Sequence, residues 1–426
     1  MTPLDKIIKE LCPNGVNEKT LSEVTVAVNI GINPRKFFKL NPDGADCFYV
    51  TVRELNGLQG VCEYDKTDKI NREAVRLINE RANIEKGDLL FSNTGTVGKM
   101  ALVLEKPEKW GVNEGIYVIK PDYKIVTSKY LFYYLSGNSA YREYSTKFTG
   151  STLKHVTQAA LLSIHIPVPP IPVQEEIVRI LDSFTELTAE LTAELTARKK
   201  QYEYYRDSLL THFTEAKNCK LADLCESIAD GDHMPPPKVD DGIPFIKISN
   251  ITEQNKIDFS NTMYVPYSYY DALAEKRKPH SGDILYTVVG SYGIPVCIEQ
   301  NIKFVFQRHI AILRPKSEIV KSRYMFYVMQ SGFFKAQAEK AARGVAQKTI
   351  SLSSLAEMIL PIPDISIQER LVQVLDNFDS ICSDLKIGLP AEIEARTKQY
   401  EYYRDKLLSF KETPTYEQKK EDSKTE

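Results

Sequence analysis

The sequence predicts an α+β fold in which two pseudo-twofold-related globular domains are separated by two long antiparallel coiled-coil helices. The segment Gln-Tyr-Glu-Tyr-Tyr-Arg-Asp at 201–207 returns unchanged at 399–405, and a Leu-Leu pair follows both copies. Upstream of each copy, apolar residues recur at alternating steps of four and three, which is the spacing of a coiled-coil seam. A repeat of about two hundred residues corresponds to a whole domain with its connector, because solenoid repeats are much shorter.

The order of shorter matches indicates where the domains begin and end. The turn Gly95-x-x-Gly98 is repeated as Gly290-x-x-Gly293, and further matches follow in unchanged order up to the helices. The tail mixes charges without an apolar period, which is typical of disorder. The predicted parts are a first globular domain at 1–165, a first spacer helix at 166–213, a second globular domain at 214–359, a second spacer helix at 360–411 and a disordered tail at 412–426.

The two predicted helices differ in length. The seam begins at Ile177 in the first copy and at Leu371 in the second, and in the second copy two steps of four fall in succession. This insertion, with Gly388 and Pro390 beside it, predicts a kink or break in the second helix. A proline-bearing extended segment precedes each helix and fixes its direction of entry.

The composition indicates two ordinary hydrophobic cores and no membrane segment. Of the 426 residues, 42% are apolar. No stretch has the length of a membrane-spanning helix or the pattern of a secretion signal, so we expect a cytoplasmic protein. The net charge of −2 does not by itself favour nucleic acid. The cysteines include no Cys-x-x-Cys pair, which argues against a disulfide framework and a zinc site; they lie at positions 12, 47, 62, 219, 225, 297 and 382.

Several motifs occur together in the repeat. An [Ile/Leu]-Pro-x-Pro segment, at 166–169 and at 360–363, precedes a Gln-Glu pair and a long heptad helix in both copies. The first helix also contains Thr-Ala-Glu-Leu twice in tandem, at 188–195, and Asp-Gly-Asp-His lies at 230–233. With these motifs, nearly the whole chain resembles the specificity subunit of type I restriction-modification systems. The resemblance implies two target recognition domains, each reading half of a split DNA sequence, and helices that set the spacer and dock methyltransferase subunits.

The resemblance also implies the partners of the chain. These are double-stranded DNA, two methyltransferase subunits and restriction or translocase subunits, without a membrane. S-adenosylmethionine, ATP and Mg would be held by the partner subunits, so no cofactor is expected in this chain. Partner subunits would also supply much of the basic surface, which would account for the nearly neutral charge.

The tandem in the first helix has a length that suits a DNA spacer. Each four-residue unit adds about 6 Å to a helix and turns it by about 40° beyond one full turn. One base pair turns a DNA duplex by about 34°. One unit is therefore close to the change of phase of one base pair.

Polar residues beside predicted strands and glycine turns are the candidates for DNA contact. Base edges need paired donors or acceptors, whereas phosphates need Lys, Arg and short hydroxyl groups. The alternative is an ordinary solvated surface, and we expect about one in three of these residues to be a contact. The candidates are Arg53, Asn56, Asn93, Thr94, Lys99, Ser151, Thr152, Lys154, Lys247, Asn250, Ser291, Tyr292, Gln307, Arg308, Arg343, Gln347 and Lys348.

The repeated tyrosine segment is the candidate for binding a partner subunit. Some of its tyrosines lie at heptad positions and would form the helix seam, whereas the others would face a protein; base stacking is the alternative. The candidates are Tyr204, Tyr205, Arg206, Tyr402, Tyr403 and Arg404. His233 lacks companion metal ligands at a suitable spacing, so we expect it to stabilise its loop through a hydrogen bond.

The motifs of catalysis are missing from the sequence. Residues 95–100 lack the glycine spacing and the following Ser or Thr of a phosphate loop, and no Asn-Pro-Pro-aromatic methyltransferase motif occurs. We therefore expect a non-catalytic DNA specificity subunit. One alternative is a coiled-coil scaffold whose domains bind proteins rather than DNA, and another is a nuclease with unrecognised motifs.

Overall fold

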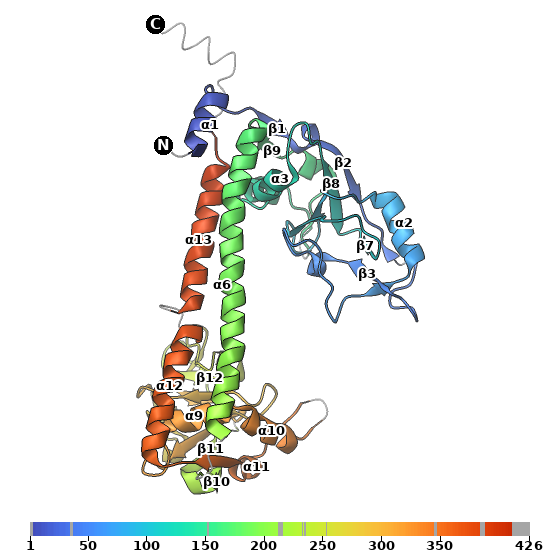
Figure 1. The fold of residues 1–426 in the computed structure, drawn as a ribbon. Helices are drawn as coiled ribbons and strands as arrows, with labels where there is room; N and C mark the ends of the chain where they lie inside the picture. Colours follow the sequence, from blue (N-terminus) through green and yellow to red (C-terminus); the bar gives the residue numbers. More distant parts are fainter. Residues whose placement is uncertain are drawn as a thin grey trace. The chain divides into compact units, whose positions relative to one another are not determined.

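The structure, a computed structural model, describes residues 3–34, 37–150, 153–211, 216–231, 233, 236–252, 254–344, 347–383 and 388–410. It consists of two compact units (Figure 1). Unit 1 comprises Met1–Ala189 with Ala395–Glu426, and unit 2 comprises Glu190–Glu394. Each unit therefore contains one globular domain and parts of the helical segments. The tail at 412–426 lies outside the described residues.

The globular domain of unit 1 contains three small sheets. A four-stranded antiparallel sheet has the order β2-β8-β5-β6, a three-stranded sheet has the order β4-β3-β7 with β3 parallel to β7, and β1 pairs with β9. The elements are α1 (Pro3–Leu11), β1 (Glu18–Thr20), η1 (Leu21–Glu23), β2 (Thr25–Ile30), β3 (Cys47–Val50), η3 (Val52–Glu54), β4 (Lys69–Ile70), α2 (Arg72–Ala82), β5 (Leu89–Ser92), β6 (Met100–Leu102), β7 (Trp110–Val112), β8 (Ile116–Pro121), α3 (Ser128–Leu135), α4 (Asn138–Ser145), α5 (Gln158–Leu162) and β9 (His165–Pro167).

Unit 2 repeats this topology. Its sheets have the orders β11-β17-β14-β15 and β13-β12-β16, with β12 parallel to β16, and β10 pairs with β18. The sequence repeat therefore corresponds to a repeated arrangement of strands. The elements are β10 (Lys217–Lys220), α7 (Leu221–Leu224), β11 (Cys225–Asp230), β12 (Ile243–Ile246), η4 (Ile248–Asn250), β13 (Met263–Val265), α8 (Tyr267–Asp271), η5 (Glu275–Arg277), β14 (Ile284–Thr287), β15 (Pro295–Cys297), β16 (Val305–Phe306), β17 (Ile310–Pro315), α9 (Ser322–Gln330), α10 (Gly332–Ala341), α11 (Leu352–Ala356) and β18 (Ile359–Ile362).

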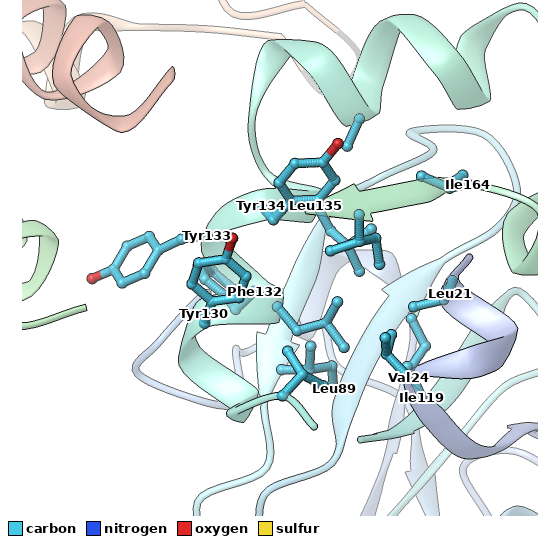
Figure 2. Packing of buried hydrophobic residues seen from close by; sticks show 14 of the residues in the cluster. Leu21, Val24, Leu89, Ile119, Tyr130, Phe132, Tyr133, Tyr134, Leu135 and Ile164 are labelled. Carbon is cyan, nitrogen blue, oxygen red and sulfur yellow. The ribbon is translucent and has the colours of Figure 1, made fainter. Parts of the chain in front are cut away.

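The central strands of each domain are covered on both faces. In unit 1, Leu89 of β5 and Ile119 of β8 are buried in one cluster with Tyr130 and Leu135 of α3 (Figure 2). Phe91 of β5 belongs to the same cluster as Leu89, whereas Leu90 between them belongs to a second cluster on the opposite face of the strand. Strands that are buried on both faces have continuous apolar sequences rather than alternating apolar and polar residues. The sequence Leu-Leu-Phe at the start of β5 is such a run.

Three helices carry the heptad pattern. α6 (Ile171–Thr211) is one helix of 41 residues, and its first part belongs to unit 1 and its second part to unit 2. The second segment forms two helices, α12 (Ile365–Ser383) and α13 (Leu389–Leu407), with Pro390 in the first turn of α13, where proline is tolerated. Residues 384–387 between them lie outside the described residues. The helices begin after the predicted positions 166 and 360, because strands β9 and β18 occupy those positions.

The seam aromatics of α6 face a different helix in each unit. In unit 1, the ring of Phe184 stacks on that of Tyr403 in α13, with centroids 5.5 Å apart. In unit 2, the ring of Tyr205 stacks on that of Phe378 in α12, with centroids 6.3 Å apart. Both contacts join heptad positions, so the predicted seam is where the helices meet.

A buried glutamine fixes the start of α6 on the domain of unit 1 and the start of α12 on the domain of unit 2. In unit 1, Gln174 of α6 is fully buried; its Oε1 accepts from Thr127 N at 2.9 Å, and its Nε2 donates to Ile125 O and Pro169 O, both at 2.8 Å. Gln368 of α12 makes the same three kinds of hydrogen bond in unit 2. A buried amide with three partners is costly to move, because each backbone group would lose its hydrogen bond.

Aromatic hydroxyls of α3 and α9 hold α6 and α12 about two turns later. The Tyr133 hydroxyl donates to Asp182 Oδ1 at 2.7 Å in unit 1, and the Tyr327 hydroxyl donates to Asp376 in unit 2. Lys129 of α3 also binds the Asp182 carboxylate, and Arg323 of α9 also binds the Asp376 carboxylate. Each helix is thus held by polar contacts on top of apolar packing.

We predict that Gln174→Ala destabilises unit 1 by about 2–4 kcal/mol, because it leaves buried backbone groups of three residues unpaired. The single tryptophan of the chain, Trp110, lies in β7 of unit 1, so its fluorescence during urea unfolding reports this unit. The exposed neighbour Glu175 provides the control, and Glu175→Ala should change stability by no more than about 0.5 kcal/mol. Equal midpoints for the two variants would contradict the role of Gln174.

Candidate nucleic-acid interface

Two distant segments of unit 1 lie side by side. We call residues 92–99 the first Gly turn, and residues 149, 150 and 153–155 the first Gly loop. Gly95 N donates to Lys154 O at 2.9 Å and joins the two segments. Gly95, with φ +75°, and Gly150, with φ +87°, adopt left-handed conformations that favour glycine. Two segments that were predicted separately as DNA contacts therefore form one surface.

Unit 2 contains the counterpart surface. We call residues 287–294 the second Gly turn, and residues 343, 344 and 347–349 the second Gly loop. Gly290 N donates to Lys348 O at 3.0 Å, as Gly95 does in unit 1. Gly290 and Gly344 again have positive φ angles, of +73° and +111°. The described parts of the two surfaces share one backbone design.

A short connector between two strands borders the surface in unit 1. We call residues 113–115, between β7 and β8, the first connector. Asn113 N donates to Val50 O at 3.0 Å, and Asn93 N donates to Gly115 O at 2.8 Å. The connector is therefore tied to the end of β3 on one side and to the Gly turn on the other.

The second connector, residues 307–309 between β16 and β17, is tied in the same way. Gln307 N donates to Ile246 O at 3.0 Å, and Val288 N donates to His309 O at 2.9 Å. These matching bonds make Glu114 and Arg308 equivalent residues. Sequence reasoning selected Gln307 and Arg308 but missed the first connector. A signal was present, since in both copies three residues separate two buried strands.

A glycine braces each connector from the opposite side. A Cβ atom on Gly31 would lie 2.2 Å from Asn113 O, and one on Gly231 would lie 2.6 Å from Gln307 O. Such distances are far below van der Waals contact, so the chain after β2 or β11 approaches the connector as closely as a backbone can. The connectors are therefore rigid.

Lys99 is the last residue of the first Gly turn, and Arg53 and Asn56 lie near it. Lys99 Nζ donates to Arg53 O at 3.1 Å, and the exposed Arg53 side chain donates from Nη1 to Lys66 O at 2.7 Å. Asn56 Nδ2 donates to Gln59 Oε1 at 2.9 Å. The Thr94 hydroxyl shares a hydrogen bond of 2.9 Å with His155 Nδ1, which holds it within the surface.

Two of the predicted contact residues are buried, and this corrects their assignment. Asn93 is 1% exposed, and its Nδ2 donates to Glu114 O at 3.0 Å. Asn250 is 5% exposed; its Oδ1 accepts from Lys247 N and its Nδ2 donates to Asp258 O and Asn261 O. Both amides shape the loops around them, because their hydrogen bonds are used inside the domain. Ser151 and Thr152 lie outside the described residues.

Most of the other candidates are exposed in their units. The exposed residues are Lys154, Ser291, Arg308, Arg343, Gln347 and Lys348, and the half-buried ones are Lys247, Tyr292 and Gln307. Lys154 Nζ lies 5.8 Å from the centre of the Phe148 ring. Burial lowers the pKa of His309 from its ordinary value, and the charge of Arg308 adds to this. Both effects favour the neutral imidazole, which offers one donor and one acceptor.

The repeated tyrosine segment divides into buried and exposed residues. Arg206 and Arg404, predicted to bind a partner, are 5% and 8% exposed; each lies over a tyrosine ring and binds the next residue, Asp207 or Asp405. We correct their assignment, since the guanidinium groups are buried and bound to residues of their own helix. The exposed rings are Tyr204 at 70%, Tyr205 at 42% and Tyr402 at 60%, while Tyr403 is half-buried in the seam.

The aspartates of the same segment bind helix starts of their domains. Asp207 Oδ2 accepts from Gly332 N at 2.8 Å at the start of α10, and Asp405 Oδ1 accepts from Asn138 N at 3.3 Å at the start of α4. A carboxylate at a helix N-terminus satisfies free N–H groups and complements the helix dipole. The repeated heptapeptide is therefore a structural clamp.

His233 and Asp230 behave as the sequence indicated. His233 Nε2 and Asp230 Oδ2 lie 2.7 Å apart, which confirms a hydrogen bond within the loop.

The described residues contain no group of three or more His, Cys, Asp or Glu side chains placed to hold a metal ion. Within the described part of the chain, no helix is long and apolar enough to cross a membrane.

The family model described as type I restriction modification DNA specificity domain matches this chain twice, over residues 13–198 and 214–395. A Haemophilus influenzae protein that bears the name of a type I restriction enzyme specificity subunit is 30% identical over 315 residues, which is 71% of this chain and 77% of that protein. The Escherichia coli type I restriction enzyme EcoR124I/EcoR124II specificity subunit is 33% identical over 275 residues, which is 59% of this chain and 64% of that protein.

A solved structure from work on the complex assembly and conformational transition of the type I R-M system has a similar fold. The match has a TM-score of 0.61 at 18% identity and covers 93% of this chain and 98% of that chain. The likeness extends over both units and the helices. The two family matches coincide with the two copies of the sequence repeat.

We predict that Gly231→Ala destabilises unit 2, because a Cβ atom would lie 2.0 Å from Phe306 O and the backbone would have to move. The expected cost is about 1–3 kcal/mol, as for other overpacked sites. Calorimetric unfolding should show it as a lower melting temperature. Lys335→Ala is the control, since the loss of this exposed side chain of unit 2 should change stability by no more than about 0.5 kcal/mol. An unchanged melting temperature for Gly231→Ala would contradict the rigid brace.

Proposed function

Because the chain belongs to the type I restriction-modification DNA specificity family, we propose that each of its two units reads one half of a bipartite double-stranded DNA site. The chain is a DNA sequence-specificity subunit of a restriction-modification system. The observation that carries the proposal is the doubled interface, in which Gly turn, Gly loop and connector recur with different side chains. A shared backbone with different side chains is what reading two different half-sites requires.

In this proposal, the cations of each interface contact phosphates and fix the register of the domain on DNA. Arg53, Lys99 and Lys154 serve unit 1, whereas Arg343 and Lys348 serve unit 2. Lysine and arginine neutralise phosphate charge and release counterions, so these contacts add affinity without sequence preference. The remaining polar groups, which include Gln307 and Gln347, are then available to base edges.

We propose that α6 acts as the spacer between the half-sites. It is one unbroken helix whose first part packs in unit 1 and whose second part packs in unit 2. Two domains that read one duplex need a separation that suits the helical repeat of DNA. A continuous helix provides a defined length, whereas a flexible linker would allow many.

Partner subunits supply the chemistry in this proposal. Two methyltransferase subunits dock on the helices, and restriction or translocase subunits join them; S-adenosylmethionine, ATP and Mg reside on those partners. The chain itself is non-catalytic. The exposed rings of Tyr204 and Tyr402 support docking on the helices, because solvent-exposed tyrosines at equivalent positions suit a repeated protein contact.

Methylation by a reconstituted complex tests the function. The purified chain, mixed with a cognate methyltransferase subunit, should direct methylation to a single bipartite site with unspecified bases between its halves. Sequencing of methylated positions in DNA of random composition measures this. Methylation that occurs without the chain would favour a protein scaffold, and one contiguous recognition sequence would contradict reading by two units.

Shortening α6 tests its role as spacer. Deleting residues 192–195, one Thr-Ala-Glu-Leu unit, removes about 6 Å of helix and about 40° of phase, so the unspecified gap should shorten by about one base pair. Both half-sites should stay the same. The double substitution Thr192→Ala and Glu194→Ala keeps the helix length and should keep the gap. Changed half-site bases in the deletion variant would contradict the spacer role.

A further inference from the structure

We propose that Glu114 and Arg308, the equivalent residues of the two connectors, are specificity-determining residues that contact base edges. Glu114 would accept a hydrogen bond from the amino group of cytosine in one half-site. Arg308 would donate two hydrogen bonds to guanine in the other half-site. The inference rests on the proposed function and adds to it the residues and the bases.

The backbone makes the two residues equivalent. Each lies between a residue that donates to the end of β3 or β12 and a residue that accepts from the Gly turn. The strand before each connector pairs in parallel with that same neighbour, β7 with β3 and β16 with β12. The two side chains therefore leave the same place in each domain, next to the Gly turn and Gly loop.

The connectors hold their side chains on a rigid support. Hydrogen bonds on two sides and the glycine brace on the third leave the backbone little freedom. Discrimination between bases requires donors and acceptors at fixed positions, whereas a phosphate contact tolerates a mobile side chain. A rigid connector is therefore better suited to base reading than the long lysines of the Gly loops.

Charge separates the first connector from the Gly turn and Gly loop beside it. Glu114 is an exposed carboxylate, whereas Lys99 of the Gly turn and Lys154 of the Gly loop are exposed cations. Phosphates repel a carboxylate, so a glutamate at a DNA surface gains only from a donor, and cytosine N4 presents one. Asn33 Nδ2 donates to one carboxylate oxygen of Glu114 and orients the group, while the carboxylate retains acceptor sites.

Arg308 has the complementary chemistry at the same place. Its side chain is exposed, and it makes no hydrogen bond or ion pair with any described residue. The whole guanidinium fork is therefore available to a ligand, unlike that of Arg53 or Arg343, which donates to a backbone carbonyl. A bidentate contact with guanine O6 and N7 uses such a fork.

The test measures base discrimination by the reconstituted methyltransferase complex. Methylation rates are compared on duplexes that carry each base pair at each position of both half-sites. Arg308→Ala should reduce discrimination by about 10- to 100-fold at one guanine position of one half-site. Glu114→Ala should do the same at one cytosine position of the other half-site. Exposed charged residues of the same units serve as controls, and Lys276→Ala and Glu105→Ala should leave discrimination unchanged.

The outcomes separate this inference from the proposed function. A wild-type chain that directs no site-specific methylation overturns both. A specific wild type with unchanged discrimination in Arg308→Ala overturns the inference alone, and so does a uniform loss of rate at all positions, which would indicate a phosphate contact. Arg308→Glu gives the second readout, since it should move the preference at the same position from guanine to cytosine.

Discussion

Each globular domain is clamped by the start of one long helix and the end of another, and the rest of the structure depends on this double attachment. In unit 1, Gln174 near the start of α6 and Asp405 near the end of α13 bind the domain. In unit 2, Gln368 near the start of α12 and Asp207 near the end of α6 do the same. α6 is therefore fixed to its own domain in each unit by buried or half-buried polar contacts. A helix held in this way can transmit its length to DNA recognition, as the proposed function requires.

The parts of the fold that the sequence predicted depend on local or repeated patterns. Alternating steps of four and three predicted the seam at which Phe184 meets Tyr403. The repeated motifs predicted one architecture in two copies, and the described sheets have the same strand orders. Gly95 and Gly290 were found as turns because positive φ angles select glycine. Each of these signals is carried by residue types at fixed spacing, so a single sequence suffices to find them.

The errors concern residues whose role depends on neighbours far away in the sequence. Asn93 and Asn250 have the chemistry of base readers, but their amides are consumed by backbone carbonyls inside the domains. Arg206 has the chemistry of a partner contact, yet it lies buried over a tyrosine ring. Glu114, which we propose to contact a base, was not selected, because phosphates repel a carboxylate and its place in the domain depends on distant backbone hydrogen bonds. Burial and satisfied hydrogen bonds are tertiary properties, and no spacing rule encodes them.

The division of labour between backbone and side chain explains how such a domain can combine a constant scaffold with variable reading. The connectors are held by backbone hydrogen bonds and by a glycine brace, which do not depend on the side chain at position 114 or 308. Substitution there leaves the support in place, because an exposed side chain contributes little to stability. The glutamines at the helix starts, in contrast, cannot change without loss of stability. Gln174 and Gln368 are fully buried, and each forms hydrogen bonds with three backbone groups. In the proposed function, specificity can therefore change at the connectors without a change in the helices, and spacing can change in α6 without a change in the bases read.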